Sequence, residues 1–336
     1  MKVSRRAFLQ GTSAIAASVV LPKWANAAPQ FTYKLGLNII ATHPSAVRCK
    51  DAAARILEET GGRLQINVFP ASALGTDTDC LSQLRSGALE MFHLSPVILA
   101  TLLPVASISG MGFAFSNYKD VWAAMDGDLG KFVREQIAKV NIIAFDKIFD
   151  NGFRVITSSV RPINTPNDLK DFKMRVPPSP LWTTLFKALG SAPTTINWAE
   201  VYSALQTKVV DGQENPINLI AVSHIYEVQK YVSVTNHMWD GFWILNNARA
   251  FKALPSDVQD IVRKNFDQAA MLQRADIADL DTHAAEDLKA KGMIFNTPDS
   301  TPFRNILTTS GWYADWRKRM GDDAWKHLEQ YSGALG

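Results

Sequence analysis

Two hydrophobic patterns alternate along the first third of the chain. Residues 31–38 and 64–69 alternate apolar and polar side chains, which is typical of half-buried strands, and 91–94 is a short apolar run. Residues 43–60 and 77–86 repeat their apolar positions at helical spacing, and a glycine directly follows each. This alternation predicts an α/β fold with largely parallel strands.

The same alternation returns further along the chain. It predicts strands at 142–148, 173–176, 193–196 and 241–245, and helices at 181–189, 198–206, 256–291 and 303–331. Asn197 and Glu200 have the spacing of a capping box at the start of 198–206. Residues 211–216 are polar, contain Gly and Pro, and read as a turn.

The length favours two lobes. One α/β domain of roughly 310 residues would be large, whereas two lobes would leave a cleft in which α/β proteins bind small ligands. We predict that lobe I comprises residues 28–151 and 241–280, and lobe II residues 152–240 and 281–336.

The N-terminal segment is typical of an export signal. Lys2, Arg5 and Arg6 precede an apolar stretch at 14–21 that is too short to span a bilayer, and Ala25–Ala27 has small residues at the spacing of a cleavage site. We predict a twin-arginine signal over residues 1–27, cleaved after Ala27, with a general secretory signal as the alternative. The mature protein would then be periplasmic.

Charge and motifs exclude several functions. Without the four basic residues of the signal, 31 Lys and Arg face 32 Asp and Glu, so nucleic acid is a poor partner, and no later segment is apolar enough to span a membrane. The six histidines and two cysteines, Cys49 and Cys80, lack metal-ligand spacing, and no cofactor is predicted. The cysteines read as buried thiols, although export would permit a disulfide. No catalytic motif occurs; a hydrolase using Asp150 or Glu214 is the alternative from another class.

Two arginines are the main candidates for chemistry. Arg154 follows a predicted strand, and Arg175 lies on a short apolar one. A buried guanidinium needs an anionic partner, and its planar fork matches a carboxylate. That partner is either a ligand or an internal Asp or Glu, and the spacing alone leaves both open. Asp150 is close enough in sequence to compete for Arg154. The acidic pair Asp77 and Asp79 reads as helix caps.

From about residue 31 onward the chain resembles the solute-binding subunits of TRAP (tripartite ATP-independent periplasmic) transporters, of the DctP type. The resemblance rests on a set of segments in a fixed order: 69–75 (Phe-Pro-Ala-Ser-Ala-Leu-Gly), 161–163, 168–170, 173–177 (Lys-Met-Arg-Val-Pro), 188–190, 193–194, 200–207 (Glu-Val-Tyr-Ser-Ala-Leu-Gln-Thr) and 211–216 (Asp-Gly-Gln-Glu-Asn-Pro). The pairing of the Arg-Val-Pro and Gln-Glu-Asn-Pro segments argues against the alternative of a subunit of an ATP-driven importer.

The resemblance implies a periplasmic-binding-protein fold, with two lobes that close on a ligand and a long helix spanning both. It implies that Arg175 binds the ligand carboxylate through two bonds, that Arg154 and Asn215 add further bonds, and that Trp198 packs on the ligand. It also implies TRAP membrane permease subunits as partners.

The ligand is expected to be a small organic acid. Trp198, Trp239, Phe242 and Leu94, with Ser95 beside them, suggest an apolar or aromatic body, as in an aryl 2-oxo acid such as benzoylformate or an aryl 2-hydroxy acid. The alternative is a sugar acid or another aliphatic carboxylate. Some of these aromatic residues are expected to belong to the core instead.

Overall fold

The computed structural model describes residues 28–336, so the predicted export signal and its cleavage site lie outside the described residues. The first lobe is built on three parallel strands in the order β2-β1-β3. The first two were predicted from the alternation of their side chains, and β3 from its short apolar run. Its elements are β1 (Phe31–Leu37), α1 (Pro44–Glu59), β2 (Leu64–Phe69), α2 (Asp77–Ser86) and β3 (Met91–Leu94). Cys49 and Cys80, on α1 and α2, are buried free thiols.

The second lobe continues the same sheet with the strand order β5-β8-β6-β7. Its elements are β5 (Phe149–Ser158), β6 (Lys173–Val176), α6 (Pro180–Ala188), β7 (Ala192–Thr195), α7 (Val201–Gln206), β8 (Gly212–Pro216), α8 (Ile217–Val222) and β10 (Ile294–Asn296), with 3₁₀ turns η2 (Pro166–Leu169), η3 (Trp198–Glu200) and η4 (Ile225–Glu227). The turn predicted at 211–216 is wrong: β8 is entirely buried between β5 and β6. The prediction failed because β8 consists mostly of polar residues, and a polar run with Gly and Pro is usually a loop rather than a buried strand.

Three further local predictions are corrected. The Asn197 side chain makes no capping hydrogen bond, and 198–206 begins as the 3₁₀ turn η3. The predicted strand 142–148 is shorter than expected: β4 (Ile142–Ala144) ends at Ala144, and β5 begins only at Phe149. The strand predicted at 241–245 is only the end of the 17-residue β9 (Tyr231–Asn247), whose polar positions concealed its length.

Strands β5 and β9 join the lobes. The end of β9, from Trp243, pairs with β3, whereas its earlier part pairs with β5 over Phe149–Ser158. A bulge lies between Asp150 and Gly152, where Gly152 has a φ of 125° and a side chain would meet Pro216. Only glycine adopts this backbone readily, so the bulge is fixed at the crossing between lobes.

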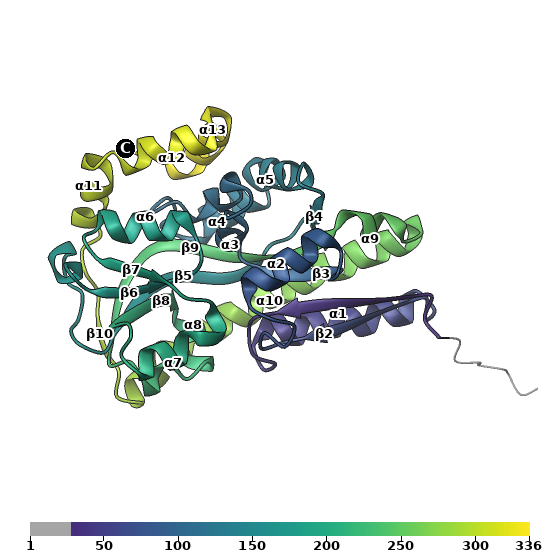
Figure 1. Cartoon of the computed structure of the whole chain (residues 1–336), viewed down its shortest axis with the longest axis horizontal. Helices are drawn as coiled ribbons and strands as arrows, with labels where there is room; N and C mark the ends of the chain where they lie inside the picture. Colours follow the sequence, from purple (N-terminus) through teal and green to yellow (C-terminus); the bar gives the residue numbers. More distant parts are fainter. Residues whose placement is uncertain (1–27) are drawn as a thin grey trace, which may run out of the picture.

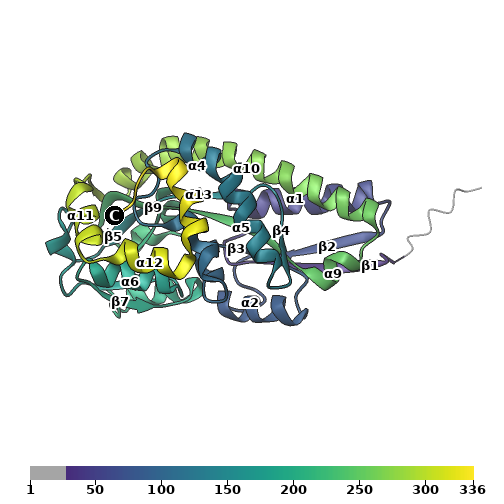
Figure 2. The same cartoon turned by 90° about the horizontal axis from the view of Figure 1, so that it is seen from above.

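Helix α10 (Ser256–Ala290) spans both lobes, as the resemblance implied. Its first half packs Val262, Phe266 and Ala270 into the core of lobe I against α1, and its end packs Leu288 into the core of lobe II. Helix α10 begins shortly after the short helix α9 (Ala248–Ala253). Figure 2 shows α10 running along most of the length of the molecule.

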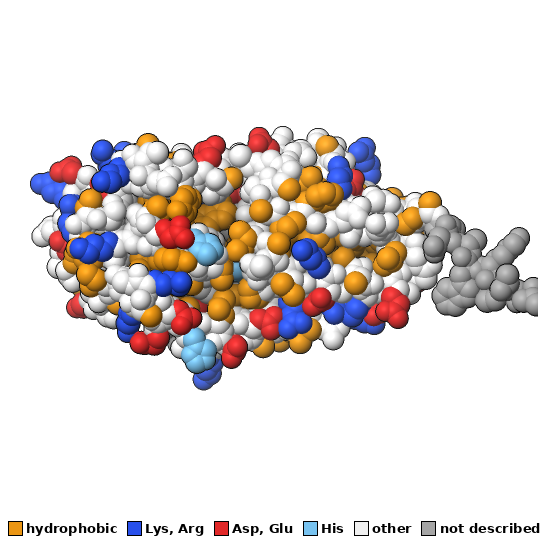
Figure 3. Space-filling model, turned by 90° about the horizontal axis from the view of Figure 1, so that it is seen from below, with side chains coloured by type: hydrophobic (Ala, Val, Ile, Leu, Met, Phe, Trp, Pro, Cys, Tyr) orange, Lys and Arg blue, Asp and Glu red, His pale blue; other side chains and the backbone are white. Residues whose placement is uncertain are grey.

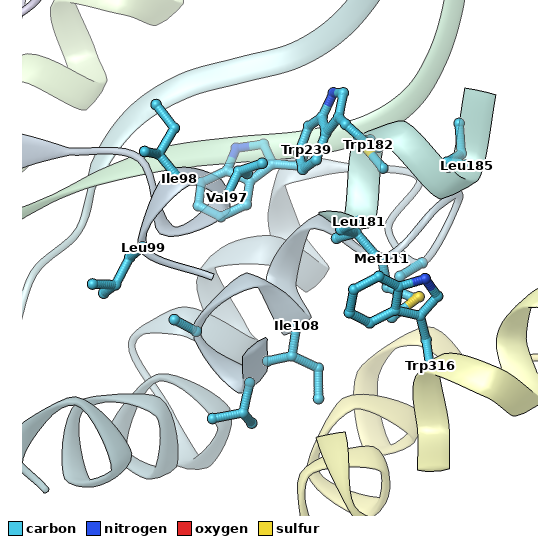
Figure 4. Close-up of a cluster of buried hydrophobic side chains, with 14 of the residues drawn as sticks. Val97, Ile98, Leu99, Ile108, Met111, Leu181, Trp182, Leu185, Trp239 and Trp316 are labelled. Carbon is cyan, nitrogen blue, oxygen red and sulfur yellow. The ribbon is translucent and has the colours of Figure 1, made fainter. Parts of the chain in front are cut away.

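A layer of helices covers the upper face of the sheet in Figure 1 and crosses both lobes. It contains α3 (Pro96–Leu99), η1 (Pro104–Gly110), α4 (Tyr118–Met125), α5 (Asp128–Ala138), α6, α11 (Thr301–Thr309), α12 (Trp312–Met320) and α13 (Asp322–Ser332). Side chains from α3, α6, β9 and α12 converge there in one hydrophobic cluster (Figure 4).

The C-terminal helix predicted at 303–331 is broken into three. Gly311 and Gly321, with φ of 74° and 90°, separate α11, α12 and α13. Helix α11 packs on α6, whereas α13 packs on α4 and α5. The C-terminal segment therefore contacts elements of both predicted lobes.

Candidate functional site

A cavity lies between the lobes, with about 380 Å³ of space not filled by protein atoms, part of it open to solvent. Many of its lining residues directly follow strands or lie on the two joining strands, β5 and β9. They are Asn38, Ile39, Asp77, Ser95, Ile98, Asn151, Arg154, Arg175, Pro177, Trp198, Asn215, Leu219, Asp240 and Phe242. Placement after strand ends is where α/β sheets bind ligands.

Six of the eight predicted site residues line this cavity: Arg154, Arg175, Asn215, Trp198, Phe242 and Ser95. The other two do not. Leu94 is wholly buried in the core, paired with Trp243 on β9. Trp239 is buried as well, and its indole N–H donates to Asp150 at 2.9 Å. Both are core residues, which the sequence analysis expected for some of the aromatic set.

Arg154 is saturated by internal acids. Its Nε donates to Glu214 Oε2, its Nη2 donates to Glu214 Oε1 at 2.8 Å, and its Nη1 donates to Asp240 at 3.1 Å. The expected competitor, Asp150, is not its partner, because that carboxylate accepts from Trp239 instead. Burial alone would raise the pKa of Glu214, but the Arg154 guanidinium lowers it to about 2.

Asp240 ties this network to lobe I. It accepts from Ser95 Oγ at 2.8 Å and from Asn151 Nδ2 at 3.0 Å, in addition to Arg154. Ser95 caps the start of α3 by accepting from Val97 N at 3.2 Å. Burial raises the pKa of Asp240, and Arg154 opposes that rise. We define the Arg154 network as Arg154, Glu214, Asp240, Ser95 and Asn151.

Arg175 has a different environment. Its side chain is 2% exposed, and its Nε and Nη2 both donate to the carbonyl of Ile196, at 2.9 and 2.7 Å. Within residues 28–336 no carboxylate forms an ion pair with it, and its Nη1 has no hydrogen-bond partner. Burial lowers the pKa of Arg175 to about 10. The Trp198 ring lies 5.8 Å from the guanidinium carbon.

Asp77 corrects another prediction. Asp79 does form a capping box with Thr76 at the start of α2, but Asp77 is buried and faces the cavity. Burial raises the pKa of Asp77 to about 6, although nearby Arg175 lowers it. Its Oδ1 has no hydrogen-bond partner in the described structure, and the same holds for Oδ1 of Asn38 and of Asn151.

The remaining wall is neutral. Asn215 lies on β8 and donates from Nδ2 to Gln213 Oε1 at 2.5 Å. Phe242 stacks on the ring of His93 at 4.3 Å. His93 is wholly buried, which lowers its pKa to about 3, so a neutral imidazole supports this wall.

Sequence reasoning missed Asn38, Asp77, Asn151 and Asp240. Asn38 directly follows β1, so its position after a parallel strand could have identified it. Asp240 and Asn151 gave no local signal, because they meet only through the pairing of β5 with β9.

The arrangement is suited to binding an anionic group that is accompanied by hydrogen-bond donors. A buried guanidinium has a free N–H, and three unpartnered acceptor oxygens belong to cavity residues. Glu214, one of the two acids considered for a hydrolase, is held by Arg154, and the other, Asp150, does not line the cavity. No cluster of three or more His, Cys, Asp or Glu within 28–336 is arranged to hold a metal, and no helix there is long and apolar enough to cross a bilayer.

Comparison with known proteins gives a consistent result. A family model described as bacterial extracellular solute-binding protein, family 7 (DctP) matches residues 38–312. An uncharacterized protein, y4mM, of Sinorhizobium fredii is 34% identical over 281 residues, 83% of this chain, which spans about half (52%) of that protein's length.

Two matches from Roseobacter denitrificans extend over nearly the full length of the matched chain. A solute-binding protein is 32% identical over 305 residues, covering 88% of this chain and 90% of that protein. The crystal structure of a TRAP periplasmic solute-binding protein with bound β-D-glucuronate superposes with a TM-score of 0.86 at 26% identity, covering 90% of this chain and 99% of that one.

Proposed function

Because the chain belongs to the DctP family of bacterial extracellular solute-binding proteins, as the match over residues 38–312 shows, we propose that it captures a small organic acid between its lobes. It would then deliver the acid to the membrane permease of a TRAP transporter. The two-lobed fold with a spanning helix is the one that the resemblance implied.

Arg175 is the observation that carries this proposal. An arginine buried without a carboxylate partner is costly, and a ligand carboxylate would relieve that cost through a charge-assisted bond. Nη1 is free to donate, whereas Arg154 has every nitrogen occupied. Arg175 is therefore the proposed carboxylate clamp, with Arg154 holding the wall behind it.

The unpartnered oxygens of Asn38, Asp77 and Asn151 indicate what else the ligand carries. All three are acceptors, so they favour a ligand that presents hydrogen-bond donors. Of the aryl acids suggested by the sequence, a 2-hydroxy acid supplies such a donor and a 2-oxo acid does not. We therefore propose a 2-hydroxy carboxylate with an apolar or aromatic body. A uronate, such as the one bound in the Roseobacter structure, is the alternative, since it too presents hydroxyl donors.

Calorimetric titration with matched acids tests this proposal. Mandelate should bind more tightly than benzoylformate, which has the same ring and carboxylate but no hydroxyl. Mandelamide, which lacks the charge, should bind at least ~100-fold more weakly than mandelate, because the buried charge pair is lost. Equal binding of mandelate and mandelamide would overturn the carboxylate clamp. Tight binding of glucuronate with no response to either aryl acid would replace the aryl body with the sugar acid.

Periplasmic delivery is part of the same proposal. The family consists of bacterial extracellular solute-binding proteins, and its relatives include periplasmic binding proteins of Escherichia coli and Vibrio cholerae. The twin-arginine signal in residues 1–27 remains a prediction. Replacing Arg5 and Arg6 with lysine should leave the protein in the cytoplasm if export uses the twin-arginine route. Unchanged periplasmic yield in fractionated cells would favour the general secretory signal instead.

A further inference from the structure

A second space lies between the lobes beside the first, and its chemistry is different. It is lined by residues of lobe I that follow β1 and β2, and by residues of η3, α7, α8 and η4 of lobe II. The space not filled by protein atoms measures about 680 Å³, and part of this volume is open to solvent. We call it the outer chamber; its walls are Asn38, Ile40, Ala71, Ser72, Trp198, Ala199, Val201, Tyr202, Val222, Ser223, His224 and Ile225.

The outer chamber has no Asp, Glu, Lys or Arg among its lining residues. The cavity that Arg175 lines, called the inner cavity from here on, has four such residues: Asp77, Arg154, Arg175 and Asp240. Aliphatic and aromatic side chains dominate the outer walls. The polar exceptions include Ser223, whose Oγ has no partner in the described structure. Helices α7 and α8 lie low in Figure 1, and Figure 3, the view from below, shows hydrophobic side chains exposed over the middle of that side.

The two spaces share a wall. Asn38 and Trp198 line both of them. Trp198 is half-buried, packs against the cores of both lobes, and has the Arg175 guanidinium 5.8 Å from its ring. A ligand whose carboxylate reaches Arg175 therefore lies next to Trp198, with the neutral chamber beyond.

We propose that the outer chamber is a second ligand subsite, which binds the apolar tail of an amphipathic 2-hydroxy acid whose carboxylate is held at Arg175. This inference rests on the proposed function and extends it to the part of the ligand that the inner cavity leaves outside. Charge separation supports it, because the arginines that can pair with an anionic head line only the inner cavity, whereas the uncharged outer walls can remove an apolar body from water without desolvating a charge. Because both lobes supply walls, the subsite is complete only when the lobes are together.

A homologous series of acids tests the subsite. Lactate, 2-hydroxyvalerate and 2-hydroxyoctanoate share one head and differ only in the length of the tail. Titration of the full mature chain should show affinity rising by about 3- to 4-fold for each added methylene, the increment expected for burial of that group. An affinity independent of tail length would overturn the subsite and leave carboxylate capture intact. Failure of every acid to bind would refute the proposed function and, with it, the subsite.

Two matched variants locate the effect. Ala199→Phe places a ring in the outer chamber from an exposed position of η3, so it should abolish the dependence on tail length while lactate binds as before. Ala278→Phe adds the same ring on the exposed face of α10, away from both spaces, and should leave the whole series unchanged. An undiminished gain with tail length in Ala199→Phe would place the tail elsewhere and overturn the subsite. The wild-type series decides the matter by itself if Ala199→Phe does not fold.

Discussion

Arg154 and Arg175 are two buried arginines in the wall of one cavity, and their surroundings are opposite. Arg154 lies on β5 between two carboxylates, Glu214 and Asp240, and all its guanidinium nitrogens are occupied. Arg175 lies on β6, where it donates to one carbonyl, that of Ile196, and no carboxylate of residues 28–336 pairs with it. Accordingly the pKa of Arg154 is raised, because Glu214 outweighs burial, and that of Arg175 is lowered by burial.

The difference separates structure from binding. The Arg154 network joins β5, β8, β9 and the start of α3, so its charges hold the crossing between lobes. A guanidinium that already pairs with internal carboxylates, as that of Arg154 does, would gain little further stabilisation from a ligand carboxylate. Arg175 has no carboxylate partner within the described residues, and for this reason we propose that it is the ligand-binding member of the pair.

Removing Arg154 should have the largest effect on stability. Arg154→Ala leaves Glu214 and Asp240 buried without their countercharge, which typically costs ~3–5 kcal/mol of unfolding free energy. Urea unfolding of the ligand-free protein measures it. Arg161→Ala is the matched control, because that lobe II arginine is only half-buried and donates to the backbone carbonyls of Asp168 and Lys170. Equal stability of the two variants would contradict a structural role for the network.

Removing Arg175 should affect binding instead. Arg175→Ala takes away the charge proposed to pair with the ligand carboxylate, so affinity should fall by ~2–5 kcal/mol, or at least ~100-fold. Arg175→Lys keeps the charge but not the planar fork and should be intermediate. The ligand-free variant should be as stable as the wild type or more so, because a buried cation without a carboxylate partner is removed. Titration and melting of the three proteins measure both quantities. A marked loss of stability with unchanged affinity would place Arg175 with Arg154.

Asp77 sharpens the comparison through pH. Its folded pKa, raised by burial to about 6, exceeds its unfolded value of 3.8, so the folded state binds more protons between these values and stability falls as pH rises through that window. Asp77→Asn should remove this loss and be more stable than the wild type by about 3 kcal/mol above pH 6, with no difference below pH 4. Urea unfolding from pH 4 to 8 tests it. Parallel pH profiles for the two proteins would show that the Asp77 carboxylate is compensated in the folded state.

The sequence predicted most elements whose side chains alternate or repeat regularly: β2, α2, β3 and β6 begin and end where the pattern placed them. It failed where polar residues are buried. Strand β8 holds Glu214, and β9 holds His237 and Asp240, all buried with partners from distant segments. Local polarity therefore suggested a turn at 211–216 and concealed the first part of β9. The same cause explains the site. The sequence identified both arginines as candidates. It could not show which of them lacks a carboxylate partner, because that depends on the pairing of β5 with β8 and β9, which brings Glu214 and Asp240 to Arg154.

The smallest predicted effect concerns the capping box that presents Asp77 to the cavity. Thr76 Oγ1 accepts from Asp79 N at 3.3 Å, and Asp79 Oδ2 accepts from Thr76 N at 3.1 Å, so two free N–H groups at the start of α2 are satisfied. Thr76→Ala should lower the unfolding free energy by ~1 kcal/mol, the usual cost of losing such a cap. Affinity for the acid should change by less than about threefold, because α2 is also held by the packing of Leu81 and Leu84. Ser86→Ala, at the other end of the same helix, is the control, since Ser86 only donates to the carbonyl of Gln83 and should be nearly neutral. A tenfold loss of affinity in Thr76→Ala would mean that the start of α2 is set by its cap rather than by its packing, and Asp77 would then depend on Thr76 for its place in the cavity.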